Sequence, residues 1–533
     1  MSEDSGWQVG SNSEPRPAEP DAAGTGPFTR LGPWLVAGFA IFLLLAYIGI
    51  DQLAPAGRNL IKVNGEDPVA YFGTTHSLLF DHDFNLTNEF AHLPPSGRWW
   101  TADQPQTGLP GSPWGLGYSF LEIPLLALGT GIDALAGNPA DGFSPWAIFF
   151  YCIGTVITAG LGLIVLFPLL RDVAAYWKIQ PADHQSAYAL FVVPIIFLGS
   201  NVGYYAFSQM AHSSTFLFAT LFLLCWWRRR DSESPRDWLV LGLIGGFLSI
   251  CRWQDALHVI GPVLYDLFGG GLLRKRAAWW RSRFLYAAGL GIWWIPQVLQ
   301  WKAIYGKYLT IPQGGGFFAF PPTHILQLLF STQSGWFSWT PVVFLGVVGL
   351  CLGAFRAPRL YLPWLIVLAL QIALIGSIPY WDGLGAFGAR YLLSNVPMTA
   401  VGLITLYGLS GVLVRRGLSV ACLACCGFTL LFAVQFRLDL IPLHTPLTYK
   451  EFISDKFDIG AARQRRAAVL TARELINQGN PLAAAEVLEA ARPLGDDRDV
   501  ELMLERAYRA AGRGAQADEA SVRHRLILDS SLF

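Results

Sequence analysis

A pair of neighbouring carboxylates, Glu66 and Asp67, lies in a polar stretch shortly after the first long apolar segment of the chain, residues 33–50. Carboxylates this close to a bilayer are costly to dehydrate, so their presence suggests a site. A carboxylate in this position is suited to take a proton from an attacking hydroxyl as a general base. Two alternatives stay open: a solvated loop whose acids have no chemical role, and a helix start that Asp67 merely caps.

A second acidic group follows in the same polar stretch. Asp81 and Asp83 flank His82, and this triplet superficially resembles the Asp-x-Asp metal motif of soluble nucleotide-sugar enzymes. Carboxylate oxygens suit Mg²⁺ or Mn²⁺, so a divalent cation is a candidate cofactor here, and no other cofactor is indicated. The alternative is that both acids position the loop through hydrogen bonds.

Cationic side chains lie at the ends of later apolar segments. Arg390 ends a glycine-rich polar stretch, and Arg252 lies close to Asp255. Arginine binds phosphate with two parallel hydrogen bonds, so both are candidates for an anionic group. Snorkelling at the membrane interface, or an ion pair between Arg252 and Asp255, is the alternative. Lys302 is a weaker candidate for the same anion, and His212 is a candidate hydrogen-bond partner of the substrate or a structural histidine.

The composition is that of an integral membrane protein. Of 533 residues, 53% are hydrophobic and 14% charged, whereas soluble domains carry roughly 25% charged residues. The formal net charge is zero, so nothing points to nucleic acid. We expect about eleven transmembrane helices, near residues 33–50, 145–170, 186–206, 211–227, 237–251, 256–271, 284–300, 339–355, 360–378, 393–414 and 418–436. Residues 113–136 are apolar but contain prolines and glycines, and we expect a membrane-surface or re-entrant segment there.

These spans divide the chain into three parts. Residues 1–32 are expected to be a disordered cytoplasmic tail, residues 33–440 the transmembrane domain with a large outer loop at 51–144, and residues 441–533 a helical domain. With the N-terminus in the cytoplasm, Lys and Arg concentrate in the expected inner loops, as the positive-inside rule requires. An odd number of spans then puts Glu66, Asp67 and the C-terminal domain outside. Gly479 and Gly512 are 33 residues apart, which indicates tetratricopeptide-like repeats that bind a protein partner, or a plain helical hairpin.

The order of these parts resembles the GT-C class of polyprenyl-phosphate-sugar-dependent glycosyltransferases. Protein O-mannosyltransferases and bacterial lipid A aminoarabinose transferases belong to this class. The resemblance covers residues 33–440 and rests on the order and sidedness of stretches 64–71 with 79–89, 199–213, 296–306, 329–341 and 381–391. It implies an all-α polytopic fold in a bacterial inner membrane, with the active site on the outer face.

The resemblance also implies roles for individual residues. Asp67 would be the general base, with Glu66 as its rival, and Arg390 and Arg252 would bind the leaving lipid phosphate. The other expected substrate contacts are Tyr71, His212 and Lys302. The partners would be a polyprenyl-phosphate-linked sugar, membrane lipids, and an acceptor that is a lipid, a glycan or a protein.

Other classes of membrane protein remain as alternatives. A transporter or flippase of lipid-linked saccharides would show repeated halves and broken helices at the midplane of the membrane. The sequence shows no such repeat, and the acids lie outside the expected spans. A polysaccharide polymerase or ligase would use the same kind of donor. A membrane anchor that presents the C-terminal domain to a partner would need neither the acidic loop nor Arg390.

Overall fold

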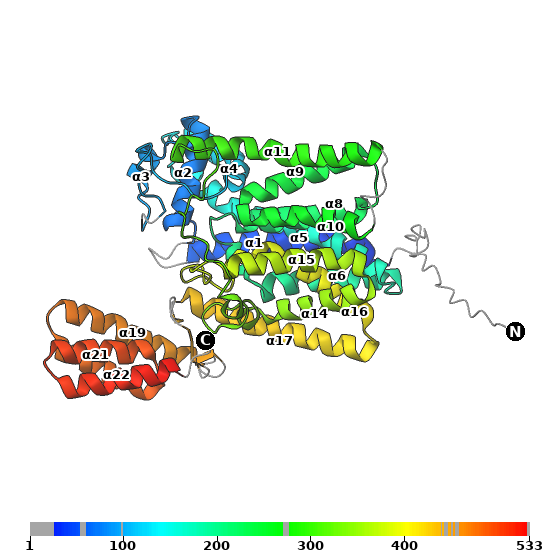
Figure 1. The fold of residues 1–533 in the computed structure, drawn as a ribbon. Coiled ribbons are helices and arrows are strands. Elements are labelled where there is room, and N and C mark those ends of the chain that lie inside the picture. The colour runs from blue at the N-terminus through cyan, green and yellow to red at the C-terminus, as the bar shows by residue number, and fades with distance from the viewer. Residues whose placement is uncertain are drawn as a thin grey trace.

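The computed structural model describes residues 26–53, 60–97, 100–269, 277–438, 440–441, 446–448, 451–452 and 458–529. These residues form an all-α fold, in which an isolated β-bridge joins Asp103 to Pro110. The long helices of the bundle in Figure 1 are α1 (Pro27–Leu53), α5 (Pro145–Tyr176), α6 (Ala182–Gly199), α8 (His212–Arg229), α9 (Pro235–Cys251), α10 (Ile260–Phe268), α11 (Ala277–Tyr305), α14 (Pro341–Arg356), α15 (Pro358–Gly376), α16 (Val396–Leu409) and α17 (Val412–Arg437).

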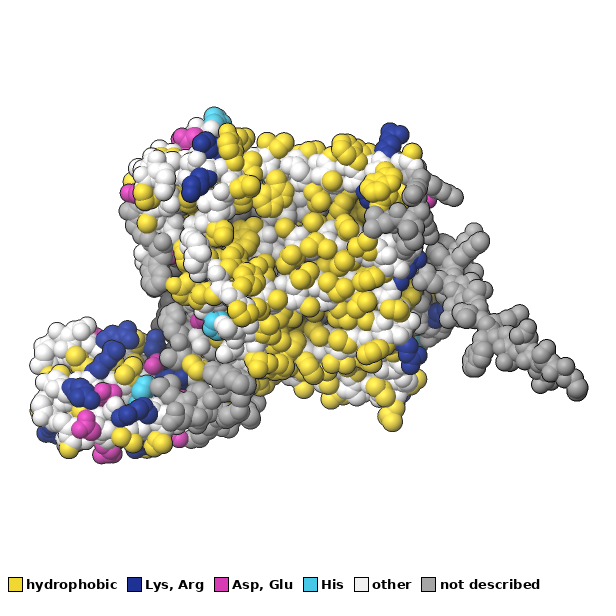
Figure 2. Space-filling view, viewed as in Figure 1, with side chains coloured by type: hydrophobic (Ala, Val, Ile, Leu, Met, Phe, Trp, Pro, Cys, Tyr) yellow, Lys and Arg dark blue, Asp and Glu magenta, His cyan; other side chains and the backbone are white. Residues whose placement is uncertain are grey.

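Each apolar stretch that was expected to span the membrane overlaps a helix of this bundle. By length and composition, seven helices in the described residues are able to cross a membrane. The number eleven therefore stays a prediction, whereas the all-α membrane architecture is confirmed. Figure 2 shows hydrophobic side chains over most of one face of the bundle, with charged side chains gathered toward its two ends.

Helices α2 (Glu66–Phe80), α3 (Thr87–His92) and α4 (Gly117–Leu135) lie at one end of the bundle, which we call the loop end (Figure 1). Helix α4 covers the segment expected to be re-entrant, yet it is one of the seven helices with the length and composition of a span. It packs on α2 and α5, and the Asp133 carboxylate accepts hydrogen bonds from the backbone N–H groups of Trp146 and Ala147. How deep α4 lies in the membrane stays a prediction.

Helix α2 begins at Glu66 because Gly65 adopts a positive φ of 99° there, a conformation that glycine enters at little cost. Pro68 is tolerated in the first helical turn, where backbone N–H groups have no partner within the helix. The helix buries most of its length, and the rings of Phe72 and Tyr151 meet edge to face at 5.0 Å. This packing fixes α2, and hence Glu66 and Asp67, against the bundle.

The boundary of the expected disordered tail at residue 32 is wrong, because α1 already begins at Pro27. The physical reason is a contact that the local sequence does not reveal. The backbone N–H and the hydroxyl of Thr29 both donate to the carboxylate of Asp183 at the start of α6. Residues 1–25 of the tail lie outside the described residues.

The connecting helices between the spans are short. They are α7 (Asn201–Tyr205), η1 (Trp253–Val259), α12 (Ile325–Phe330), α13 (Trp336–Trp339) and η3 (Arg390–Asn395). Helix η1 directly follows α9, and η3 directly precedes α16. Both carry residues discussed below.

The C-terminal domain consists of α19 (Ile459–Asn477), α20 (Pro481–Ala491), α21 (Arg498–Ala510) and α22 (Gly514–Asp529), with the short turn η5 (Arg492–Leu494). Gly479 and Gly512 follow α19 and α21 with positive φ angles of 78° and 73°, so each ends the first helix of a pair. Because the two glycines occupy equivalent positions in two successive helix pairs, their spacing of 33 residues is explained. The assignment to tetratricopeptide repeats stays a prediction. Figure 1 shows this domain beyond the loop end of the bundle.

Helices α14 and α16 approach each other through glycines. A Cβ atom on Gly349 would lie 1.8 Å from the carbonyl oxygen of Gly402, and one on Gly346 would lie 2.3 Å from that of Thr399. Small residues at such contacts let two backbones come close, which is a main source of helix association in membranes.

Gly349→Ala is therefore expected to destabilise the bundle by about 1–3 kcal/mol, because the new methyl group forces the two backbones apart. Gly427→Ala in α17 is the matched control, since a Cβ atom there meets nothing within 4 Å. Thermal unfolding of both variants in detergent measures the difference. Equal melting temperatures for the two variants would contradict the tight α14–α16 contact.

Candidate functional site

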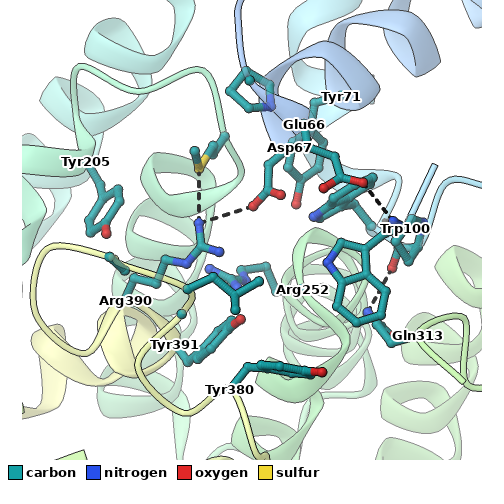
Figure 3. Close-up of a pocket in the computed structure, with 18 of the residues that line it drawn as sticks. Glu66, Asp67, Tyr71, Trp100, Tyr205, Arg252, Gln313, Tyr380, Arg390 and Tyr391 are labelled. Carbon is teal, nitrogen blue, oxygen red and sulfur yellow. Dashed lines mark hydrogen bonds and ion pairs between the residues drawn. The ribbon is translucent and has the colours of Figure 1, made fainter. Parts of the chain in front are cut away.

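A cavity of about 360 Å³ opens at the loop end, between the start of α2, the segment from α9 into η1, and the loop that leads into η3. Figure 3 shows part of its lining, with Asp67, Arg252 and Arg390 among the labelled side chains. Ten of the 28 lining residues are aromatic: Tyr71, Trp100, Trp114, Tyr204, Tyr205, Trp253, Phe317, Tyr380, Tyr391 and Phe436. Charged groups in the lining are Glu66, Asp67, Arg252 and Arg390.

Asp67 and Arg390 form an ion pair across this cavity, with 3.1 Å between Oδ2 and Nη1. Their side chains are only 21% and 13% exposed, so the pair is largely withdrawn from water. Asp67 lies in the first turn of α2, where the helix dipole favours a negative charge. The N-cap of α2 is Gly65 without a side-chain hydrogen bond, so the alternative that Asp67 serves only as a cap is wrong.

Glu66 has a different environment from its neighbour. Its Oε1 accepts hydrogen bonds from the backbone N–H groups of Trp100 at 2.7 Å and Thr101 at 3.4 Å. Glu66 thus fixes the segment that carries the Trp100 ring. Asp67, in contrast, lies at the cavity with Arg390 as its ion-pair partner. Nothing in the sequence pattern separates the two acids, because these partners lie 34 and 35 residues away.

Two guanidinium groups flank one tyrosine ring at the cavity. The Cζ atoms of Arg252 and Arg390 lie 5.2 and 5.4 Å from the centre of the Tyr391 ring. Arg390 Nε is buried with no hydrogen-bond partner among the described residues. Two carboxylates and two guanidinium groups line the cavity, so their formal charges balance. The Glu66 carboxylate is held by backbone N–H groups, whereas the two guanidinium groups beside Tyr391 form a local cationic site for an anion.

Arg252 is held by His212 and not by Asp255. Its Nη1 donates to His212 Nδ1 at 2.7 Å, and the ion pair with Asp255 considered above is not formed in the described structure. His212 is only 2% exposed and is not part of the cavity lining. It therefore acts through Arg252 as a positioning residue, and its expected role as a direct substrate contact is not supported by this geometry.

Three other residues expected at the site lie elsewhere. Lys302 is exposed and donates to the backbone carbonyl of Gly306 at 2.9 Å, outside the cavity lining. The reason is that α11 continues past the cavity to Tyr305. Asp81 and Asp83 follow the far end of α2, about 20 Å along the helix from Asp67 at 1.5 Å per residue, and neither lines the cavity.

The cavity also contains polar groups that the sequence reasoning missed. Gln254 and Gln313 line it, and Gln313 Oε1 is buried without a hydrogen-bond partner. Amide groups and aromatic rings together suit a ligand with hydroxyl groups and C–H faces. The only sequence signal was the abundance of aromatic residues in the polar loops.

A buried polar network lies behind the arginines. Ser394 of η3 donates to Asp255 Oδ1 of η1 at 2.7 Å, and Gln371 of α15 bonds both His258 of η1 and Asn395 of η3. Because Arg252 precedes η1 and Arg390 begins η3, this network fixes the two segments that carry the cationic groups.

Comparisons with known proteins find similar chains among solved structures. No family model and no curated protein matches the sequence. Among solved structures, the chain is similar to ArnT from Cupriavidus metallidurans in the apo state, with a TM-score of 0.47 and 13% sequence identity over 93% of this chain and 77% of that chain. At this identity and TM-score the likeness assigns no activity, so the chemistry has to be argued from the cavity.

Ser394→Ala is expected to cost about 1–3 kcal/mol of stability, because it leaves the buried Asp255 carboxylate without its donor. The other oxygen of Asp255 already lacks a partner. Ser377→Ala is the matched control, since this buried hydroxyl donates only to the Leu374 carbonyl of its own helix. Melting temperatures in detergent distinguish them, and a loss no larger than that of the control would argue against the network.

Proposed function

We propose that this protein is a membrane glycosyltransferase that moves a sugar from a polyprenyl-phosphate donor to an acceptor hydroxyl in the loop-end cavity. The observation that carries the proposal is the meeting of Asp67, Arg390 and Arg252 in one aromatic-lined cavity at an end of a membrane bundle. A general base, an anion site and access from the membrane are the three requirements of this transfer.

In the proposed reaction, the acceptor oxygen attacks the anomeric carbon and the bond from that carbon to the phosphate oxygen breaks. The electron pair leaves with the phosphate, whose charge Arg390 and Arg252 stabilise through charge-assisted hydrogen bonds. Asp67 takes the acceptor proton. The aromatic walls stack on the C–H faces of the sugar, and Gln254 and Gln313 bond its hydroxyl groups.

The ion pair between Asp67 and Arg390 connects these two roles. A phosphate that binds Arg390 competes with Asp67 for the same guanidinium. Donor binding therefore frees the carboxylate to accept a hydrogen bond from the acceptor hydroxyl. A cation at Asp81 and Asp83 would be too far away to contact the phosphate, so the proposed transfer depends on the arginines.

The surroundings of the site are proposed on the same basis. We place the loop end and the C-terminal domain on the outer face of a bacterial inner membrane, where the acceptor is a lipid, a glycan or a protein. A polymerase or ligase of lipid-linked saccharides would use the same groups. A flippase or other transporter would have no need of a base beside the anion site.

Asp67→Asn is expected to lower sugar transfer by about 10²–10⁴-fold, because the amide does not accept the proton. The assay is transfer from a panel of radiolabelled polyprenyl-phosphate sugars in proteoliposomes, with native membrane extract as the acceptor source. Glu66→Gln is the matched control, since its amide oxygen still accepts from the Trp100 N–H, and we expect at most a few-fold loss. Wild-type transfer by Asp67→Asn would exclude it as the base.

Arg390→Lys is expected to raise the KM for the donor by roughly tenfold to a hundredfold, the equivalent of one lost charge-assisted hydrogen bond at about 1.5–3 kcal/mol. Lysine keeps the charge but not the two-pronged geometry. Arg228→Lys is the control, because Arg228 pairs with Asp172 and lies outside the cavity lining. An unchanged donor KM in Arg390→Lys would place the phosphate elsewhere.

A further inference from the structure

Three side chains with metal-binding atoms converge away from the cavity, on the other half of α2. His76 of α2, Asp81 in the turn after it and Glu89 of α3 each offer one atom, and these atoms lie within 4.8 Å of one another. His76 is nine residues beyond Asp67, about 13 Å along the helix. This cluster is therefore separate from the proposed transfer site and does not depend on it.

The hydrogen bonds of His76 show why a positive charge is needed here. Its Nε2 lies 2.8 Å from the backbone carbonyl oxygen of Asp141, which only accepts, so Nε2 carries a hydrogen. In neutral imidazole, Nδ1 then presents its lone pair. That lone pair faces Glu89 Oε1 at 2.9 Å, which is unfavourable unless a proton or a metal ion lies between the two atoms.

Glu89 adds a second, independent sign of a missing partner. It is only 1% exposed, and its Oε2 is buried with no hydrogen-bond partner. The Asn88 side-chain amide donates to Glu89 Oε1 and to Asp81 Oδ2, and so turns both carboxylates toward the same point. Asp81 is exposed, which leaves a path from solvent to the buried pair.

We propose that His76 Nδ1, one Asp81 oxygen and one Glu89 oxygen bind a single divalent transition-metal ion, Zn²⁺ or Mn²⁺. Imidazole nitrogen together with carboxylate oxygen suits these ions better than Mg²⁺ or Ca²⁺, which prefer oxygen alone. On binding, the proton between His76 and Glu89 leaves to solvent. Nε2–H bonded to a backbone carbonyl is the usual orientation of a metal-binding histidine.

This ligand set differs from the Asp81 and Asp83 pair that the sequence suggested. Asp83 Oδ1 accepts from the Ser77 hydroxyl and from the Asn85 backbone N–H, so it closes the turn after α2. The ion joins α2, the following turn and α3, and through His76 it reaches the Asp141 loop. Its role is to hold the helix that carries Asp67 in place.

The test uses the full chain in detergent, stripped with EDTA and dialysed against Zn²⁺, Mn²⁺ or Mg²⁺ in turn. We expect about one Zn²⁺ or Mn²⁺ per chain by elemental analysis and a higher melting temperature with that ion than with EDTA or Mg²⁺. No retained ion and an unchanged melting temperature would overturn the proposal and leave a buried ion pair. A gain with Mg²⁺ alone would overturn the transition-metal assignment.

Asp81→Asn tests the ligand set with little risk to folding, because Asp81 is exposed. Loss of a residue that merely supports a ligand lowers metal affinity about 10–100-fold, so loss of a ligand is expected to cost at least tenfold. Asp83→Asn is the matched control and should bind the ion like the wild type. Equal affinities in the two variants, or a loss confined to Asp83→Asn, would overturn the assignment. Neither readout requires sugar transfer.

Discussion

The ion pair between Asp67 and Arg390 is the interaction on which the rest of the site depends. It joins two residues that are 323 positions apart and links the first turn of α2 to the start of η3. Withdrawing two charges from water is costly, and removing one partner leaves the other uncompensated. The guanidinium groups of Arg252 and Arg390 lie beside the same Tyr391 ring, so an incoming anion that takes the place of Asp67 beside Arg390 meets a second cation.

Two sets of contacts fix the segments that carry Asp67 and Arg390. Behind the arginines, Asp255, Ser394 and Gln371 connect the segments that carry Arg252 and Arg390. Opposite them, α2 is packed on α4 and α5, and its far half is tied to α3 through His76 and Glu89.

The C-terminal helices lie beyond the same end of the bundle (Figure 1). Arg498 of α21 forms an ion pair of 3.0 Å with Glu451 of the connecting segment.

Much of the fold follows from local sequence, because long apolar runs are sufficient to predict membrane helices. The acids and arginines of the cavity could also be selected one by one, since each is a charge at the end of an apolar run. Their contact could not, because no local pattern relates residues 323 positions apart. The same limit explains two wrong predictions. Lys302 was expected to contact the substrate, but its helix extends past the cavity. The tail was expected to end at residue 32, but the contact of Thr29 with Asp183 lies within a helix that begins at Pro27. The separate roles of Glu66 and Asp67 needed the position of Trp100.

The most direct test of the central claim is the affinity of Asp67→Asn for polyprenyl phosphate itself, measured by equilibrium binding in detergent beside the wild type. If Asp67 and the phosphate compete for Arg390, removing the carboxylate charge frees the guanidinium, and the variant should bind the lipid phosphate more tightly. The same protein should be deficient in transfer. Equal or weaker binding by Asp67→Asn would contradict the account, because Arg390 would then not be shared between the base and the leaving group.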